Sequence, residues 1–401
     1  MLSIDQRLDE RLLAAIDEQR PLIFEISDAI HDRPELQFKE VFASDLLTRT
    51  FEDLGFKVTR GVSGMPTAFT AELDSGKPGP TVAFLAEYDA LPNLGHGCGH
   101  NLIAASTVAG GIGMKAILEE TGGKLIIFGT PAEEGGGGKI PMVKDALFEK
   151  VDAVMMVHHG GDETSVPTEE GTGRCLAVSH RRYEFFGKTA HAAADPWNGA
   201  NALNAVIHLF LGIDSLRQHI HDDVRIHGII SHGGDAPNVT PHYTSAEILV
   251  RAPEAARVIE VSGKVDRIAE AAAMMTETTT KISETGDMYY DMRPNYALGR
   301  RYAENLKRMG LALRQREPGV GMYSTDFGNV SYAAPSSGCQ FAISNEPIPG
   351  HSPQVVACSA SDMGRENMLR AAKAMALTAL EVLTDPALAQ AARDEFNASK
   401  A

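Results

Sequence analysis

The chain has 401 residues, 43% of them hydrophobic and 22% charged, which is typical of a folded globular protein. A chain of this length exceeds what one hydrophobic core usually accommodates, so we expect two domains. The formal net charge of −16 argues against nucleic acid as a partner, because the phosphates would be repelled. The sequence has no long apolar run, and its charged N-terminus lacks the apolar core of a signal peptide. We therefore expect a cytoplasmic protein without membrane contact.

Helix-like and strand-like segments alternate in the first 175 residues. Apolar residues at helical spacing come first, and three apolar strand-like runs follow, the first two separated by a helix rich in small residues. The segments are 10–30 and 41–55 (helical), 81–90 (strand), 102–120 (helix), 124–130 and 152–159 (strands). This alternation predicts a layered α/β domain with a largely parallel sheet.

The pattern changes near residue 175. Strand-like segments with alternating polarity, typical of a half-exposed antiparallel sheet, share the next hundred residues with two helices, at about 199–217 and 254–275. An α/β pattern returns from about residue 290 and ends in a strand-like 339–344 and a helix at about 360–384. We expect a catalytic domain of residues 1–175 and 290–401, interrupted by a small α+β, ferredoxin-like domain of residues 176–289.

Four groups of metal-ligand residues follow apolar strands, where loops line the crevice of an α/β sheet. Thiolate, imidazole and carboxylate are the common ligands of zinc, and manganese, cobalt or nickel are alternatives. The candidates are Cys98 and His100 in GHGCGHN, Glu133 and Glu134 in TPAEEGGGGK, His158 in MMVHH, and His351 in IPGHSP. Taken alone, Cys-x-His is also compatible with a buried thiol and a capping histidine. Four groups with the same placement favour a metal site.

The adjacent carboxylates of Glu133 and Glu134 indicate two different roles. One of Glu133 and Glu134 can bind a metal while the other takes a proton from water, although an acidic turn in solvent is the simpler alternative. Asp89 can accept the N–H of a ligand histidine, or cap a turn. His191 falls in the inserted domain, so we do not expect it to bind the same metal; it is either functional or an ordinary histidine.

With these motifs assembled, the chain resembles the dinuclear metallopeptidase family of aminoacylases and carboxypeptidase-like enzymes. The amidohydrolase branch, with hippurate hydrolases, aminobenzoyl-glutamate hydrolases and aminoacylase-like dipeptidases, is the most similar. The resemblance rests on motifs that run in family order from about residue 83 to 353: AEYDALP, GHGCGHN, GTPAEEGGGGK, VMMVHHG, GKTAHAAADPWNGANAL, GGDAPNVTP and GHSP.

The resemblance implies a role for each matching residue. It implies five metal ligands, Cys98, His100, Glu134, His158 and His351. It implies Glu133 as general base, and His191 and Asn238 as contacts of the substrate carbonyl. Arg251 and Arg293 stand where family members often hold a substrate carboxylate. It also implies that the inserted domain acts as a lid and dimerises, which predicts a homodimer with His191 reaching into the partner's site.

Three positions depart from the common family pattern. Glu87 stands where many relatives have a ligand histidine, a departure shared by the amidohydrolase branch. His159 stands where a proline is common, and His242 where an acidic residue is common. The first departure leaves open whether one or two divalent ions bind, and zinc or manganese is expected.

We therefore predict a hydrolase that cleaves the C–N bond of a small N-acyl amino acid, dipeptide or aryl amide. The water is activated by metal, and Glu133 acts as base. A deaminase acting on an amine-bearing ring compound is the alternative with the same apparatus. A non-catalytic metal-binding protein would lack the base. A thiol redox protein built on Cys98 would need a second cysteine nearby, but the other three are distant in sequence.

Overall fold

The computed structural model describes residues 4–169, 173–315 and 319–400, which form two compact units. The first unit contains Met1–Arg174, Met292–Gly321 and Thr325–Ala401, and the second contains Cys175–Asp291 and Met322–Ser324. The predicted domain ranges place 322–324 with the catalytic domain. The structure groups them with the second unit, where the backbone N–H of Leu176 donates to the carbonyl oxygen of Tyr323 at 2.8 Å.

The first unit contains a six-stranded sheet in the order β1-β2-β4-β3-β5-β12. Strands β3, β4, β5 and β12 are parallel, whereas β1 and β2 add an antiparallel edge. The strands are β1 (Lys57–Arg60), β2 (Phe69–Asp74), β3 (Thr81–Ala86), β4 (Lys124–Gly129), β5 (Ala153–His159) and β12 (Ser336–Phe341). The layered α/β prediction is confirmed. The edge pair of β1 and β2 was not predicted. The short and mostly exposed β1 gives little hydrophobic signal, whereas the six-residue β2 was missed although half of it is buried.

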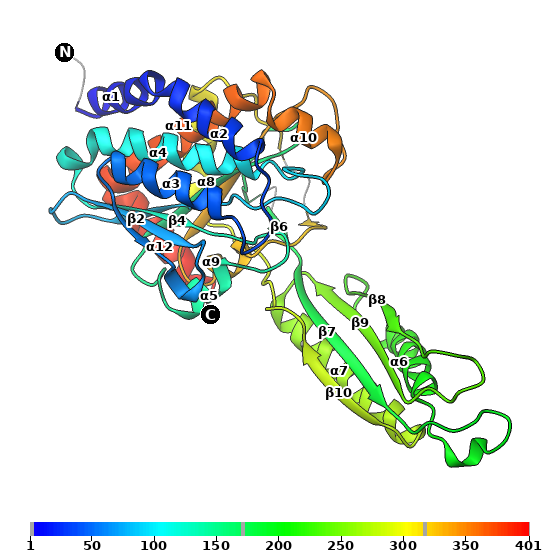
Figure 1. Ribbon diagram of the computed structural model, residues 1–401. Coiled ribbons are helices and arrows are strands. Elements are labelled where there is room, and N and C mark those ends of the chain that lie inside the picture. Colours follow the sequence, from blue (N-terminus) through cyan, green and yellow to red (C-terminus); the bar gives the residue numbers. More distant parts are fainter. Residues whose placement is uncertain (1–3, 170–172, 316–318, 401) are drawn as a thin grey trace. The chain divides into compact units, whose positions relative to one another are not determined.

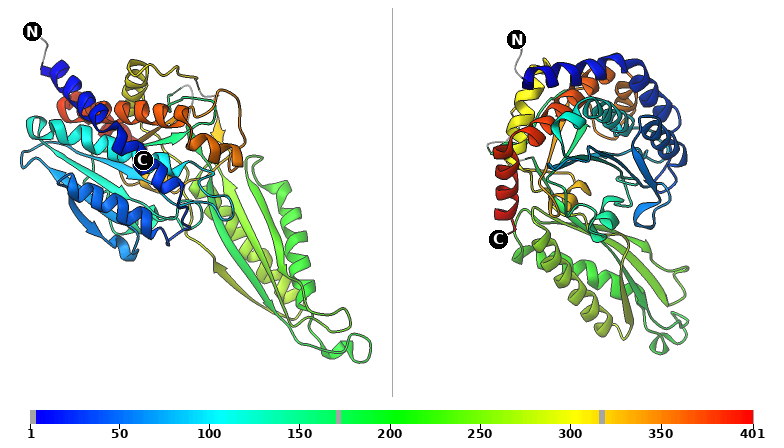
Figure 2. Two further views of the ribbon diagram at one scale, coloured as in Figure 1. Left: turned by 45° about the horizontal axis from the view of Figure 1, so that its top comes forward. Right: turned by 90° about the vertical axis from the view of Figure 1, so that its left-hand side faces the viewer.

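Helices cover this sheet in two successive layers (Figures 1 and 2). Helices α4 and α11 pack on β3 and β5, and α1 and α2 pack on α4. The helices of the unit are α1 (Ile4–Glu18), α2 (Arg20–His31), α3 (Val41–Asp53), α4 (His100–Thr121), α5 (Lys139–Lys144), α8 (Tyr296–Arg308), α9 (Phe327–Ser331), α10 (Pro353–Ser359), α11 (Asp362–Thr384) and α12 (Pro386–Ala398). The predicted helix over 10–30 is two helices, with Pro21 in the first turn of the second.

Most residues of helix α4 are buried. It is long and apolar enough to cross a membrane, but 89% of its apolar window is buried inside the structure. Its small residues allow this burial. A Cβ on Gly110 would lie 2.8 Å from the Phe84 ring, and one on Gly113 would lie 2.8 Å from Ile16. α4 therefore has the position of a core helix, and its first residue, His100, lies at the carboxyl edge of the sheet.

The second unit is an antiparallel sheet in the order β10-β7-β9-β8, packed with two helices. Its elements are β7 (Ala177–Phe186), α6 (Ala202–Leu216), β8 (Arg225–His232), β9 (Tyr243–Ala252), α7 (Ala255–Met275) and β10 (Thr279–Glu284). Four strands and two helices agree with the predicted α+β architecture. Strand β8 forms one edge of the sheet, and its Ile229 is 63% exposed.

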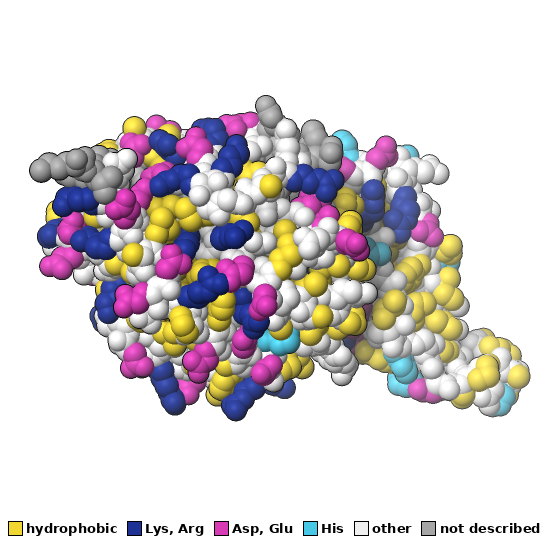
Figure 3. Space-filling model, turned by 90° about the horizontal axis from the view of Figure 1, so that it is seen from above, with side chains coloured by type: hydrophobic (Ala, Val, Ile, Leu, Met, Phe, Trp, Pro, Cys, Tyr) yellow, Lys and Arg dark blue, Asp and Glu magenta, His cyan; other side chains and the backbone are white. Residues whose placement is uncertain are grey.

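Acidic and basic side chains intermingle over the first unit on the face drawn in Figure 3, and hydrophobic side chains are more prominent over the second unit. Although the net charge is −16, the acidic side chains therefore do not form one negatively charged patch on that face.

Candidate metal centre

The predicted site residues lie in loops that leave the carboxyl ends of the parallel strands. Glu87 and Asp89 follow β3, Glu133 and Glu134 follow β4, and His158 lies at the end of β5. His351 lies in the segment between β12 and α10. Because parallel strands end at one edge of a sheet, residues distant in sequence meet there.

His100 is the buried centre of the cluster. Its Nδ1 lies 2.9 Å from Asp89 Oδ1, and both side chains are 1% exposed or less. The second oxygen of Asp89 accepts the backbone N–H of Glu134 at 3.0 Å. Burial alone would raise the pKa of Asp89, but the charge and hydrogen bond of His100 and the bond from Glu134 lower it. Asp89 therefore orients two of the predicted ligands together.

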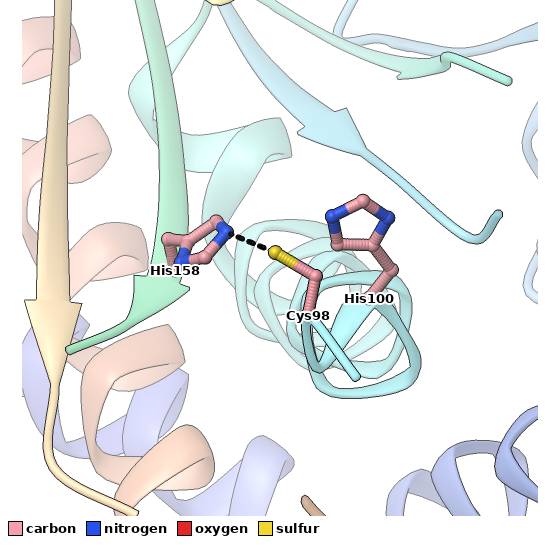
Figure 4. A group of neighbouring side chains, drawn as sticks. All are labelled: Cys98, His100 and His158. Atoms are coloured by element: carbon pink, nitrogen blue, oxygen red, sulfur yellow. Dashed lines mark hydrogen bonds between the residues drawn. The ribbon is translucent and has the colours of Figure 1, made fainter. Parts of the chain in front are cut away.

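Cys98 and His158 face each other beside His100 (Figure 4). The distance from Cys98 Sγ to His158 Nε2 is 3.5 Å. The Nδ1 of His158 lies 2.8 Å from the carbonyl oxygen of His159, an acceptor, so Nδ1 is the protonated nitrogen and Nε2 holds the lone pair. Burial lowers the pKa of His158, which keeps the imidazole neutral as a ligand must be.

His351 lies beside Glu134. Its Nε2 lies 3.5 Å from Glu134 Oε2, and its backbone has a φ of 50°, which an L-residue adopts rarely. The donor atoms form two groups of three, Cys98–His100–His158 and Cys98–Glu134–His351, each with atoms within 4.8 Å of one another. All five predicted ligands are thus brought together, and Cys98 is common to both groups.

The donor set fits a divalent cation. Among the described residues, no hydrogen-bond partner is found for His100 Nε2 or Glu134 Oε1, although both atoms are buried. Such buried atoms are costly unless a ligand satisfies them. Burial raises the pKa of the Cys98 thiol, and only a nearby cation would make the thiolate the stable form.

Glu133 lies at the rim of this donor set. Its carboxylate is within 4.8 Å of ligand atoms of His100 and Glu134, the reach required of a base that takes a proton from a water at the metal. Burial raises the pKa of Glu133 well above its usual range, and the charges of Glu87 and Asp326 raise it further, while Lys139 opposes them.

Two buried residues that sequence reasoning missed adjoin the cluster. Lys139 Nζ lies 2.7 Å from Glu87 Oε1 and 2.5 Å from Asp326 Oδ1, with all three side chains at most 1% exposed. Asp326, near the start of α9, has no motif around it. One feature of the sequence singles out Lys139. It follows four glycines and precedes an apolar helical segment, so it does not belong to a charged helix face in solvent.

Glu40 is a third missed residue, and it supports the loop that carries Glu133. Its Oε1 accepts the backbone N–H groups of Phe38 and Ala132, each at 2.9 Å, and its Oε2 accepts the hydroxyl of Thr67 at 2.9 Å. Ala132 directly precedes Glu133 and has a φ of 59°, an unfavourable conformation for alanine. Glu40 therefore helps to hold a strained turn whose next residue is the predicted base.

His191 and Asn238 lie together in the second unit. The backbone N–H of Ala192 donates to the carbonyl oxygen of Asn238 at 3.1 Å. The Nδ1 of His191 accepts the backbone N–H groups of Ala193 and Ala194, at 3.2 and 3.1 Å. The neutral imidazole therefore carries its proton on Nε2, and the side chain is exposed. This is the form required to donate a hydrogen bond to a substrate oxygen.

The two predicted carboxylate-binding arginines differ in their surroundings. Arg251, on β9, donates to Ser324 Oγ at 2.9 Å, and within the described ranges no carboxylate lies within 4.0 Å of its guanidinium. Burial lowers its pKa. Arg293 instead lies 3.6 Å over the Tyr332 ring and donates to the carbonyl oxygen of Ser399 at 2.8 Å. Arg293 thus holds the C-terminal end of the chain, and its predicted role in substrate binding remains a prediction.

An α/β sheet whose carboxyl edge gathers thiol, imidazole and carboxylate donors beside a buried glutamate defines a metallohydrolase. Comparison with known families identifies the group. The chain belongs to peptidase family M20/M25/M40, whose model matches residues 83–381. It is therefore a metal-dependent hydrolase that acts on C–N bonds, and the predicted family resemblance is confirmed.

Curated relatives match nearly the whole chain. An Xaa-Arg dipeptidase from Mus musculus is 38% identical over 97% of this chain and 92% of its own length. A chain of the p-aminobenzoyl-glutamate hydrolase from Escherichia coli (strain K12) is 32% identical over 95% of this chain and 93% of its own length. The two relatives differ in the substrate that their names give.

Solved structures share the fold. A putative aminohydrolase from methicillin-resistant Staphylococcus aureus has a TM-score of 0.77 at 22% identity, over 94% of this chain and 100% of that chain. A dinuclear metal-binding M20 peptidase from Bacillus subtilis has a TM-score of 0.68 at 20% identity, over 92% of this chain and 99% of that chain. At these identities the likeness concerns the fold alone.

Proposed function

We propose that the protein is a dipeptidase that releases a basic amino acid, arginine above all, from the C-terminal position of a dipeptide. The observation that carries the proposal is the similarity to Xaa-Arg dipeptidases along the chain, 38% over 97% in the mouse protein and 34% over 96% in the human protein. The predicted metal ligands and the predicted base of such a hydrolysis lie close together in the first unit, which supports the proposal.

The reaction converts an amide and one water into a carboxylate and an amine. A divalent ion, when bound, supplies a Lewis acid and lowers the pKa of a water ligand toward neutrality. Glu133 accepts the proton of the attacking water and donates it to the leaving nitrogen, so the same carboxyl serves as base and then acid. Asp89 holds His100 and the backbone of Glu134 in place during both steps.

We further propose two ions, each held by one of the two groups of three that share Cys98. A thiol and three imidazoles among the donors favour zinc, while the carboxylate of Glu134 also suits manganese. The solved M20 peptidase that is described as dinuclear supports the number two by analogy only.

Arg251 is the proposed partner of the substrate carboxylate. His180 on β7 and His227 on β8 both pair with Leu249, and Arg251 follows two residues later on the same face of β9. Burial and the charge of Arg251 lower the pKa of both histidines, so Arg251 supplies the positive charge of this face, and an anion such as a peptide carboxylate complements it.

A homodimer in which His191 serves the partner's centre is also proposed. The unpaired edge of β8 and the exposed Ile207, Leu211 and Ile229 offer a surface that a second copy would cover. A cytoplasmic location remains part of the proposal and rests on the sequence alone.

The test is a substrate panel offered to enzyme reconstituted with zinc or manganese. The panel contains an Xaa-Arg dipeptide, an Xaa-Glu dipeptide, an N-acetyl amino acid and p-aminobenzoyl-glutamate, with chromatographic detection of released amino acid and a parallel ammonia assay. We expect the highest kcat/KM for the Xaa-Arg dipeptide. Faster release of glutamate or aryl acid would overturn the specificity, and release of ammonia alone would identify a deaminase.

A further inference from the structure

A second cluster of carboxylates adjoins the metal centre on the side of Glu133. Oxygen atoms of Glu87, Glu133 and Asp326 lie within 4.8 Å of one another, and the side chains of Glu87 and Asp326 are at most 1% exposed. Three carboxylates around one point form an oxygen site of the kind that manganese, magnesium and calcium prefer. Glu133 would then be a ligand and could not act as a base.

The ammonium of Lys139 already lies at this cluster. It is 2.7 Å from Glu87 Oε1 and 2.5 Å from Asp326 Oδ1, and its side chain is fully buried. Burial alone would lower the pKa of Lys139, but the charges of Asp326, Glu87 and Glu133 outweigh burial and raise it, so the amine remains a cation. Such a buried charge is tolerated only with partners of this kind.

The backbone fixes the lysine in this place. Asp326 Oδ2 accepts the backbone N–H of Lys139 at 3.0 Å, so one carboxylate binds both the main chain and the side chain of the residue. The preceding Gly138 approaches Pro131 so closely that a Cβ there would lie 2.0 Å from the carbonyl oxygen. The start of α5 is thus held against the loop that carries Glu133.

We propose that Lys139 is a positioning residue, a fixed internal cation that fills the carboxylate cluster, excludes a metal ion from it and keeps Glu133 available as a base. The ammonium and a divalent ion would share the same two oxygens, and their like charges would repel each other at that distance. Lys139 thereby confines divalent ions to the donors on the Cys98 side of the centre. The inference concerns metal binding and is independent of which substrate is cleaved.

The experiment counts manganese ions per chain at saturating Mn²⁺, by equilibrium dialysis and elemental analysis, and locates them by anomalous scattering. Lys139→Met should bind one manganese ion more than the wild-type enzyme, located between Glu87 and Asp326. Its kcat should fall at least tenfold, and the loss should deepen as Mn²⁺ is raised. Lys139→Arg, which keeps the cation, and Lys144→Met, on the exposed side of the same helix, should keep the wild-type count.

The number of manganese ions bound per chain distinguishes this role of Lys139 from a merely structural one. A folded Lys139→Met enzyme with the wild-type number of ions, or with the extra ion elsewhere, would overturn the proposal. If the variant folds only in the presence of Mn²⁺, the proposal stands when the extra ion lies between Glu87 and Asp326 and fails when no ion lies there. If it remains unfolded at every Mn²⁺ concentration while Lys139→Met/Asp326→Asn folds, the cluster does not accept a metal ion and the proposal fails.

Discussion

Asp89 accepts a hydrogen bond from His100 at 2.9 Å through one oxygen and the backbone N–H of Glu134 at 3.0 Å through the other. The first bond places the imidazole proton on Nδ1, so the lone pair of Nε2 can bind a metal ion. The second holds the main chain of another ligand. One buried carboxylate thus couples the loops after β3 and β4, which carry different predicted ligands.

Asp89→Asn should weaken metal binding by about 10- to 100-fold, because the amide no longer offers two anionic acceptors. The measurement is a competition titration with a chelating dye, with Cys98→Ser as a comparison that removes a direct ligand and should bind still more weakly. Wild-type affinity in Asp89→Asn would show that the carboxylate does not orient the ligands.

Glu40 gives a pH dependence of stability. Burial raises its pKa from 4.5 to about 7, despite hydrogen bonds that lower it. Between these two pH values the folded state binds more protons than the unfolded state, so stability should fall as pH rises through that window. The expected loss, relative to Glu40→Gln, is up to about 3 kcal/mol.

Denaturant unfolding of both proteins from pH 5 to 8, in chelator to remove any contribution from metal binding, measures this difference. Glutamine keeps an oxygen for the N–H groups of Phe38 and Ala132, so the variant should fold. The stability of the wild type relative to the variant should decline up to about pH 7 and then remain level. A constant or rising difference would show that Glu40 is not buried with a raised pKa.

The two arginines should behave differently. Arg251→Ala should raise KM for a dipeptide about tenfold or more, because a charge-assisted bond to the substrate carboxylate is lost. The effect should vanish for a substrate whose carboxylate is amidated. Arg293→Ala should lower the melting temperature, since its guanidinium contacts Tyr332 and Ser399. An increase in KM confined to Arg293→Ala would reverse the assignment.

His191→Ala should reduce kcat about 100- to 1,000-fold with unchanged metal content, as the loss of one donor to a developing oxyanion does. Mixing this variant with Glu133→Gln tests its action on the partner. A mixed dimer should regain activity in up to half of its centres, because one of them combines an intact base with an intact histidine. If subunit exchange occurs without recovered activity, His191 does not act across the dimer.

Sequence patterns predicted the strands and helices in which apolar residues follow a regular spacing. Strand-like runs located β3, β4, β5 and β12, and their shared edge explains why the residues after them meet. The edge strands β1 and β2 and the short helix α9 were missed. β1 and α9 have only four and five residues, which carry too little periodicity.

The same limit applies within the centre. The predicted metal ligands are recognisable by residue type and motif, whereas Glu40, Lys139 and Asp326 act through contacts between distant segments. The Lys139–Asp326 pair spans 187 positions, and the Glu40–Ala132 bond spans 92. A single sequence shows the residues but not these partners.

The central claim is that Glu133 is the proton carrier of a metal-dependent hydrolysis and not a metal ligand. The direct measurement is kcat for an Xaa-Arg dipeptide, together with metal content, in Glu133→Gln. The account predicts the wild-type metal content and a kcat lower by about 100- to 10,000-fold, because only the proton acceptor is removed. Retention of more than about a tenth of the wild-type kcat, well above the loss expected for a general base, would contradict it, as would a loss of bound metal.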